Sequence, residues 1–110
     1  MTRYFQTVFF GLAAMLVFAG SANATSGPGC FQIVNVANND VLNIRAEPNA
    51  GAKLTGTMMP REHGIIHGEG PCKPKAVALN QRWCPIIHYH GGGTTLGWVK
   101  RRYLRDSDCP

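Results

Sequence analysis

The sequence predicts a small all-β domain, a barrel or sandwich of about five short strands. Short segments rich in β-branched and aromatic residues recur at intervals of roughly ten residues. Turn-forming residues separate them, and the chain contains 13 glycines and 7 prolines, a composition that favours many short turns. No segment has the pattern of a strong helix.

Residues that favour turns lie between the expected strands. The strands are expected at 31–36, 41–45, 53–59, 65–69, 81–90 and 96–100. In the second, alternation places Leu42 and Ile44 inward and Asn43 and Arg45 outward. Gly56 in the third predicts a bulge or a close backbone approach, and Pro85 in the fifth predicts an edge or a bulge.

The segments between the strands are expected to be turns and loops. Turns are expected at 38–40, 47–51, 60–64 and 91–95. Residues 70–80 form a polar insertion, in which 76–79 could make one helical turn. After the last expected strand, 101–104 is expected to form a single 3₁₀ turn.

The first 24 residues are expected to be a secretory signal peptide. Arg3 gives the start a positive charge, 8–18 is an apolar run, and Ala22 and Ala24 suit a cut after Ala24. The run is shorter than the roughly 20 residues that a spanning helix needs. We therefore expect a flexible leader at 25–29 and one domain at 30–110, periplasmic or secreted, with no stable membrane span.

Four cysteines predict two disulfide bonds, because an exported chain reaches an oxidising compartment. Three pairings are possible. We favour Cys30 with Cys109, since domain ends are often close together, and Cys72 with Cys84, which flank the insertion. On the loop-entropy model these bonds contribute about 4.5 and about 3 kcal/mol. A zinc site is the alternative, but the sequence has no C-x-x-C pair.

Several motifs occur in a characteristic order. They are Leu42-Asn43-Ile44-Arg45, Glu47-Pro48, Gly56-Thr57, Gly64, Trp83-Cys84-Pro85-Ile86, Gly97-Trp98-Val99 and Tyr103-Leu104. This series resembles the bacterial SH3-like domain family over about residues 41–104. The resemblance implies an SH3-like barrel of about five to six short antiparallel strands, which the two expected disulfide bonds would staple.

The spacing of apolar residues predicts the core. Residues spaced to line one interior are Leu42, Ile44, Leu54, Ile65, Ile87 and Val99. Trp98 is expected to add a large apolar area to this core.

Catalysis is not expected, and neither is a cofactor. Most of the acidic residues fall in expected turns or in the tail; they are Asp40, Glu47, Glu62, Glu69, Asp106 and Asp108. Ser26 and Ser107 lie near the ends of the mature chain, and oxidised cysteines offer no thiolate.

Three histidines are weak candidates for a metal or pH-sensing site. His88 and His90 share a strand face, and His67 on another strand could approach them. Such a trio could hold zinc or copper or respond to pH. The simpler interpretation is three solvent-facing histidines, so no metal is expected.

The candidate ligand-binding residues are Asn43, Arg45, Trp83, Tyr89 and Tyr103. For Asn43 and Arg45, the alternative is a structural role in fixing the first turn by hydrogen bonds. A basic cluster near the end of the chain contains Lys100, Arg101, Arg102 and Arg105. In an exported protein it suits an anionic wall polymer, lipid head groups or an acidic protein better than nucleic acid, and the alternative is a solvated face of a basic domain that binds nothing.

The resemblance implies a monomeric, non-catalytic binding module of the periplasm or cell envelope. Its expected partner is a cell-wall component or an envelope protein. The alternative is a dedicated interaction or inhibitor protein that acts on a secreted partner, and a histidine-based metal or pH sensor is a weaker third hypothesis.

Overall fold

The computed structural model of the 110-residue chain describes residues 29–61 and 64–110. The expected signal peptide, most of the expected leader and Glu62 lie outside these described residues. Within the described ranges no helix is long and apolar enough to cross a membrane.

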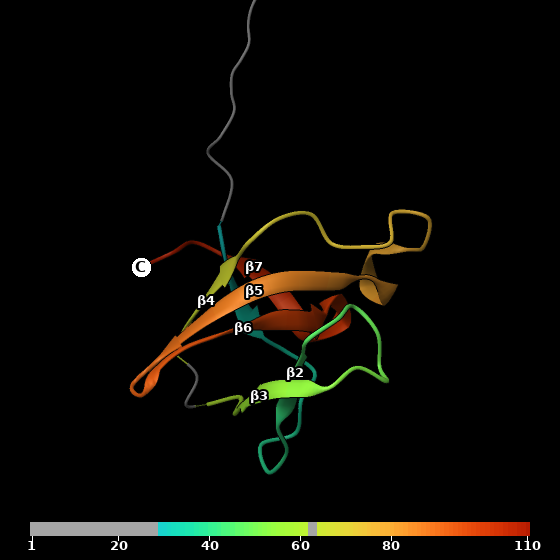
Figure 1. Cartoon of the computed structure of the whole chain (residues 1–110). Helices are drawn as coiled ribbons and strands as arrows, with labels where there is room; N and C mark the ends of the chain where they lie inside the picture. The colour runs from blue at the N-terminus through green and yellow to red at the C-terminus, as the bar shows by residue number, and fades with distance from the viewer. Residues whose placement is uncertain (1–28, 62–63) are drawn as a thin grey trace, which may run out of the picture.

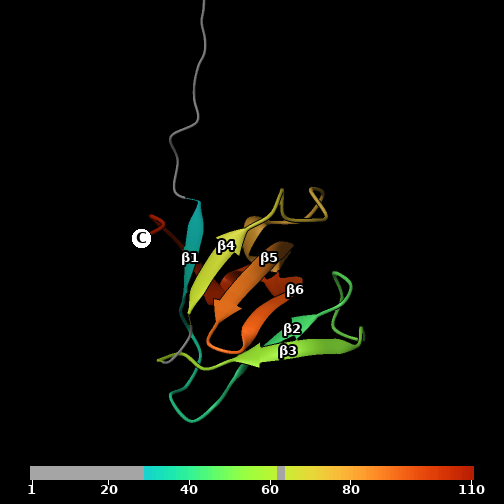
Figure 2. The same ribbon diagram turned by 60° about the vertical axis from the view of Figure 1, so that its left-hand side comes forward.

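The described chain is all-β, as predicted. Its seven strands are β1 (Cys30–Ile33), β2 (Leu42–Arg45), β3 (Leu54–Met58), β4 (Ile65–Gly68), β5 (Trp83–His90), β6 (Gly93–Lys100) and β7 (Leu104–Ser107). They form one antiparallel sheet in the order β3-β2-β6-β5-β4-β1-β7, which curls around the core (Figures 1 and 2). Among the described residues β3 and β7 remain the two edges, so the barrel is not closed.

Both predicted disulfide bonds are present. Cys30 is joined to Cys109, with a Cα–Cα distance of 5.0 Å, and Cys72 is joined to Cys84, with a Cα–Cα distance of 4.1 Å. The first bond ties β1 to the segment after β7, and the second holds the insertion against β5. The described chain has no free cysteine.

The core is built from alternate residues of the strands. Its buried members are Leu42, Ile44, Met58, Ile66, Cys84, Ile86, Val99 and Leu104. The prediction was right for three of these, Leu42, Ile44 and Val99. It was wrong for Leu54 and Ile65, which are 45% and 42% exposed.

Two neighbouring isoleucine pairs explain the wrong assignments in β4 and β5. In β4 the buried residue is Ile66, not Ile65, and in β5 it is Ile86, not Ile87. Because the side-chain period of a strand is two, a pattern with two adjacent apolar residues fits either phase. Pairing with the neighbouring strands decides between them.

Trp98 does not belong to the core, contrary to the prediction. It is half-buried and lies on the sheet face opposite Val99, which is fully buried. Its ring lies 5.8 Å from Lys73 Nζ. The outer surface of the sheet therefore carries this large side chain.

The predicted irregularity at Gly56 is confirmed. Ile44 pairs with Gly56 and Arg45 with Leu54, so the register shifts and Thr55 is the extra residue. The backbone also approaches closely at Gly97 of β6, where an added Cβ would lie 2.5 Å from Ile44 Cγ2. This approach lets β6 cross β2, with Arg45 opposite Trp98.

The edge or bulge predicted at Pro85 is not found, because β5 is an interior strand and Pro85 pairs with Trp98 of β6 without a register shift. The β4–β5 pairing ends at Gly68 and Ile86, and the Pro85 carbonyl accepts a hydrogen bond from Glu69 N at 2.9 Å. The missing N–H of Pro85 thus falls just past the end of the ladder.

The 3₁₀ turn after β6 agrees with the prediction, but the helical turn of the insertion lies at Leu79–Gln81 instead of 76–79, and the last strand was not predicted. The 3₁₀ turns are η3 (Leu79–Gln81) in the insertion and η4 (Arg101–Tyr103) after β6. Strand β7 then pairs with β1, from Ile33 opposite Leu104 to Cys30 opposite Ser107. Its sequence, LRDS, gives little local indication of a strand.

Candidate functional site

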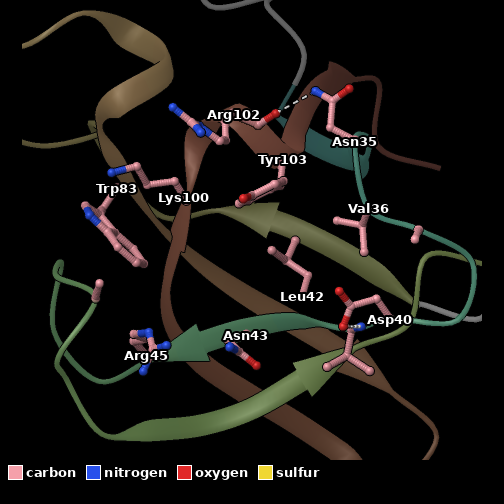
Figure 3. A pocket seen from close by; sticks show the side chains of 13 residues that line it. Asn35, Val36, Asp40, Leu42, Asn43, Arg45, Trp83, Lys100, Arg102 and Tyr103 are labelled. Atoms are coloured by element: carbon pink, nitrogen blue, oxygen red, sulfur yellow. Dashed lines mark hydrogen bonds between the residues drawn. The ribbon is translucent and has the colours of Figure 1, made fainter.

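A surface groove of about 470 Å³ lies between β2, the β1–β2 loop and η4 (Figure 3). Its lining residues are Asn35, Val36, Ala37, Asp40, Val41, Leu42, Asn43, Arg45, Ala50, Trp83, Lys100, Arg102 and Tyr103. The groove thus gathers side chains from segments that are far apart in the sequence.

Strand β2 places two of the candidate residues in the groove. Because Leu42 and Ile44 are buried, Asn43 and Arg45 project from the other face of the strand. Arg45 Nη1 donates a hydrogen bond to the Ala52 carbonyl at 2.9 Å. Arg45 therefore does fix the turn after β2, as considered from the sequence, and it also lines the groove.

The β5–β6 hairpin provides an aromatic side chain and a cation at one end of the groove. Trp83 at the start of β5 pairs with Lys100 at the end of β6, and Lys100 Nζ lies 5.2 Å from the Trp83 ring centroid. Two backbone hydrogen bonds with Lys73, of 2.8 and 2.7 Å, hold Trp83 in place. Figure 3 shows Lys100 and Trp83 on one side of the groove, with Arg45 below them.

The β1–β2 loop forms the opposite wall. Asn35 has a φ of 61°, a left-handed conformation that asparagine tolerates better than most residues. Its side-chain amide donates to the Arg102 carbonyl at 2.9 Å and fastens the loop to η4. Farther along the loop, Asp40 Oδ1 accepts a hydrogen bond from Val41 N at 2.7 Å.

An apolar floor lies between the two ends. Leu42 is a buried core residue, and Val36 and Tyr103 are partly buried and pack against the same core. The Val34 amide donates to the Tyr103 carbonyl at 2.9 Å, which keeps η4 against the loop. The floor is therefore part of the rigid core of the domain.

The charged groups of the groove are not neutralised by one another. The ion pairs within residues 29–61 and 64–110 join His67 to Glu69 and Arg101 to Asp106. None of the groove's cations, Arg45, Lys100 and Arg102, belongs to either pair, and neither does its carboxylate, Asp40. A ligand can pair with all of them.

The structure brings four of the five sequence candidates together. Asn43, Arg45, Trp83 and Tyr103 all line the groove. Tyr89 does not: it is 44% exposed and lies six residues beyond Trp83 on β5, about 20 Å away along an extended strand. It pairs with Ile65 on one side and Thr94 on the other.

Sequence reasoning missed several lining residues. Lys100 and Arg102 were assigned to a basic cluster suited to an anionic ligand but not to one site with Trp83, although the pairing of the β5–β6 hairpin places Lys100 opposite Trp83. No local signal marks Asn35, Val36 or Asp40, because their loop joins the groove only through its contact with η4.

The remaining basic residues of the terminal cluster are used elsewhere. Arg101 pairs with Asp106 at 3.3 Å and its guanidinium lies 5.7 Å from the Phe31 ring. Arg105 hydrogen-bonds to Gln32 on the neighbouring strand β1. Two of the four clustered cations thus stabilise the β1–β7 region instead of the groove.

The histidines are not brought together as the sensor hypothesis requires. His67 pairs with Ile87 and His88 with Ile66, so they occupy opposite faces of the sheet. His88 is buried and its Nε2 accepts a hydrogen bond from Gly64 N at 3.1 Å, with the His90 ring 5.0 Å away. In the described part of the chain no three His, Cys, Asp or Glu side chains are grouped to hold a metal ion.

A second surface feature lies on the outer face of β4, β5 and β6. Ile65 pairs with Tyr89, Ile87 with Leu96 and Pro85 with Trp98. Ile65, Tyr89 and Leu96 are 42%, 44% and 60% exposed. We call this set, made up of Ile65, Pro85, Ile87, Tyr89, Leu96 and Trp98, the outer apolar face.

Comparison with known proteins supplies no relative from which a role could be transferred. No protein-family model, no curated protein and no solved structure matches the chain. The function must therefore be argued from the groove and the outer apolar face themselves.

Proposed function

We propose that the protein is a non-catalytic binding module of the periplasm or cell envelope, and that it holds cell-wall material in the groove. The observation that carries the proposal is that half-buried Trp83 lines the groove beside cations that have no ion-pair partner among the described residues. An indole offers a flat apolar surface for a sugar ring or a peptide side chain. Arginine and lysine bind the carboxylates of wall polymers.

The compartment is supported by the cysteine chemistry. Two disulfide bonds are consistent with an oxidising, extracellular environment. The signal-peptide pattern of residues 1–24 supports export. In that compartment, cell-wall material is an abundant anionic polymer, and its charge would attract a monomeric basic domain.

The bacterial SH3-like assignment is part of this proposal. Its support is the ordered motif series from Leu42-Asn43-Ile44-Arg45 to Tyr103-Leu104, together with a small sheet of short antiparallel strands. The groove is lined by residues of the first motif, Leu42-Asn43-Ile44-Arg45, and by Tyr103 of the last. Under this assignment a bound ligand would therefore contact the residues that carry the resemblance.

A binding role fits the chemistry of the groove better than catalysis does. Asp40 is the one carboxylate among its lining residues, which include no histidine, cysteine or serine. A single exposed carboxylate supplies no acid–base pair. We therefore assign no catalytic residue and no cofactor.

Cosedimentation of the oxidised protein with purified peptidoglycan tests the proposal. We expect Trp83→Ala to weaken binding about tenfold or more, because truncation of a central aromatic removes a large part of a binding surface. Tyr89→Ala is the matched control, since it removes an exposed aromatic from the same strand outside the groove. It should leave the bound fraction unchanged.

Two results would reject wall binding in the groove. One is wild-type protein that stays in the supernatant at every concentration of peptidoglycan. The other is equal loss of binding in Trp83→Ala and Tyr89→Ala, which would place the ligand outside the groove.

The outer apolar face favours a second candidate function, a dedicated complex with a secreted or envelope protein. Contiguous apolar surface of this kind is typical of protein interfaces. Under this function one stoichiometric partner from envelope extract would bind Trp83→Ala but not Tyr89→Ala. The same two variants therefore separate the two functions.

A further inference from the structure

We infer that the groove takes the peptide portion of wall material, as a short zwitterionic peptide with its carboxylate at Trp83 and its ammonium group at Asp40. This inference rests on the proposed function and specifies its ligand. It follows from the distribution of charge along the groove.

The end of the groove at Trp83 is suited to a carboxylate. Lys100 Nζ lies over the Trp83 ring, and Arg45 is held beside it by the hydrogen bond to the Ala52 carbonyl. Neither cation has an ion-pair partner among the described residues. Two fixed cations beside an apolar ring provide both charge and reduced solvation for a bound anion.

The other end carries the opposite charge. Figure 3 shows Asp40 on the far side of Leu42 from Trp83 and Lys100. One carboxylate oxygen accepts the Val41 amide at 2.7 Å, which fixes the orientation of the side chain. Asp40 likewise has no ion-pair partner in the described chain, so it can pair with an ammonium group of a ligand.

The middle of the groove suits a peptide. Leu42, Val36 and Tyr103 provide an apolar floor for the uncharged part of a peptide. A glycan of N-acetylated sugars has no ammonium group for Asp40. A peptide that carries a carboxylate and an ammonium group can pair with the cations at one end and with Asp40 at the other. Because the two ends have opposite charges, it can bind in one direction only.

Calorimetric titration with defined wall fragments tests the inference. The probes are a disaccharide–peptide fragment with a free side-chain amine, the same fragment with that amine acetylated, its carboxylate methyl ester, and the disaccharide without peptide. Wild-type protein is compared with Asp40→Asn, which retains the acceptor for Val41 N, and with Lys100→Gln. Glu47→Gln and Lys53→Gln, exposed and outside the groove lining, are the matched controls.

Acetylation should weaken binding to wild type and to both controls by up to about fivefold, which is the upper end of what a solvent-exposed ion pair contributes. It should change nothing in Asp40→Asn, because the pair is already lost. Esterification should likewise weaken binding in wild type and have a smaller effect in Lys100→Gln.

Three outcomes would overturn the inference. If peptidoglycan binds in a Trp83-dependent manner but acetylation has no effect, the proposed function stands and the zwitterionic ligand is rejected. Equal binding of the peptide-free disaccharide also rejects it. Failure of every fragment and of whole peptidoglycan to bind removes the proposed function together with the inference.

Discussion

At the scale of single residues, Gly97 determines whether β6 can cross β2. A Cβ at this position would lie 2.5 Å from Ile44 Cγ2, 2.7 Å from the Arg45 carbonyl oxygen and 2.8 Å from Thr55 Oγ1. One of these neighbours is backbone and another is a fully buried side chain, so neither can move cheaply. The glycine of the G-W-V motif is therefore required by packing.

Gly97→Ala should lower the free energy of unfolding by about 1–3 kcal/mol, the usual cost of overpacking a well-packed site. Urea denaturation followed by tryptophan fluorescence measures the change. Gly91→Ala is the control in the same hairpin, because a Cβ there meets nothing within 4 Å. Equal free energies of unfolding for the two variants would contradict the prediction, because they would show that β2 and β6 can move apart to accommodate the added Cβ without loss of stability.

At the scale of elements, the two disulfide bonds hold different parts of the sheet. Cys30–Cys109 closes a loop of sequence separation 79 and secures β1 beside β7. Cys72–Cys84 has a separation of 12 and fixes the insertion next to Trp83. The first bond should therefore contribute mainly to global stability, and the second should also position the groove.

Replacement of each cystine by two alanines tests this division. Loop entropy predicts losses of about 4.5 kcal/mol for the Cys30–Cys109 bond and about 3 kcal/mol for the Cys72–Cys84 bond. Chemical denaturation gives the stabilities, and peptidoglycan binding under native conditions gives the second readout. A variant without Cys72–Cys84 that binds as tightly as wild type would show that the insertion does not position Trp83.

Much of the fold could be predicted from local sequence. Alternation in 41–45 identified both the inward and the outward residues of β2, because its apolar and polar residues strictly alternate. Alternation could not assign the adjacent isoleucines of β4 and β5, because either residue of each pair could be the one that points inward. Strand β7 was missed because its hydrogen-bond partners come from β1, at the other end of the domain.

The candidate site was predictable only in part, for a similar reason. Asn43 and Arg45 follow from strand alternation, and Trp83 and Tyr103 are large aromatics outside the predicted core. Asp40 belongs to a loop whose position depends on Asn35, which bonds to a residue 67 positions away. Contacts of that range leave no periodic signal in a single sequence.

At the scale of the whole molecule, charge makes wall binding dependent on ionic strength. The chain has a formal net charge of +5, and the groove brings three cations together with one carboxylate. Charges farther apart than about 8 Å are largely screened at physiological salt. Added salt should therefore weaken both the general attraction of the domain to an anionic polymer and the local pairing in the groove.

The contribution of the groove can be separated from that of the net charge. Lys100→Gln and Lys53→Gln remove the same charge, but only Lys100 lines the groove. Peptidoglycan binding should weaken several-fold between about 50 and 300 mM NaCl for wild type and Lys53→Gln, and less steeply for Lys100→Gln. Cosedimentation isotherms at each salt concentration measure the slopes. Equal slopes for the two variants would mean that the domain binds through its overall charge and that the cations beside Trp83 have no special part in recognition.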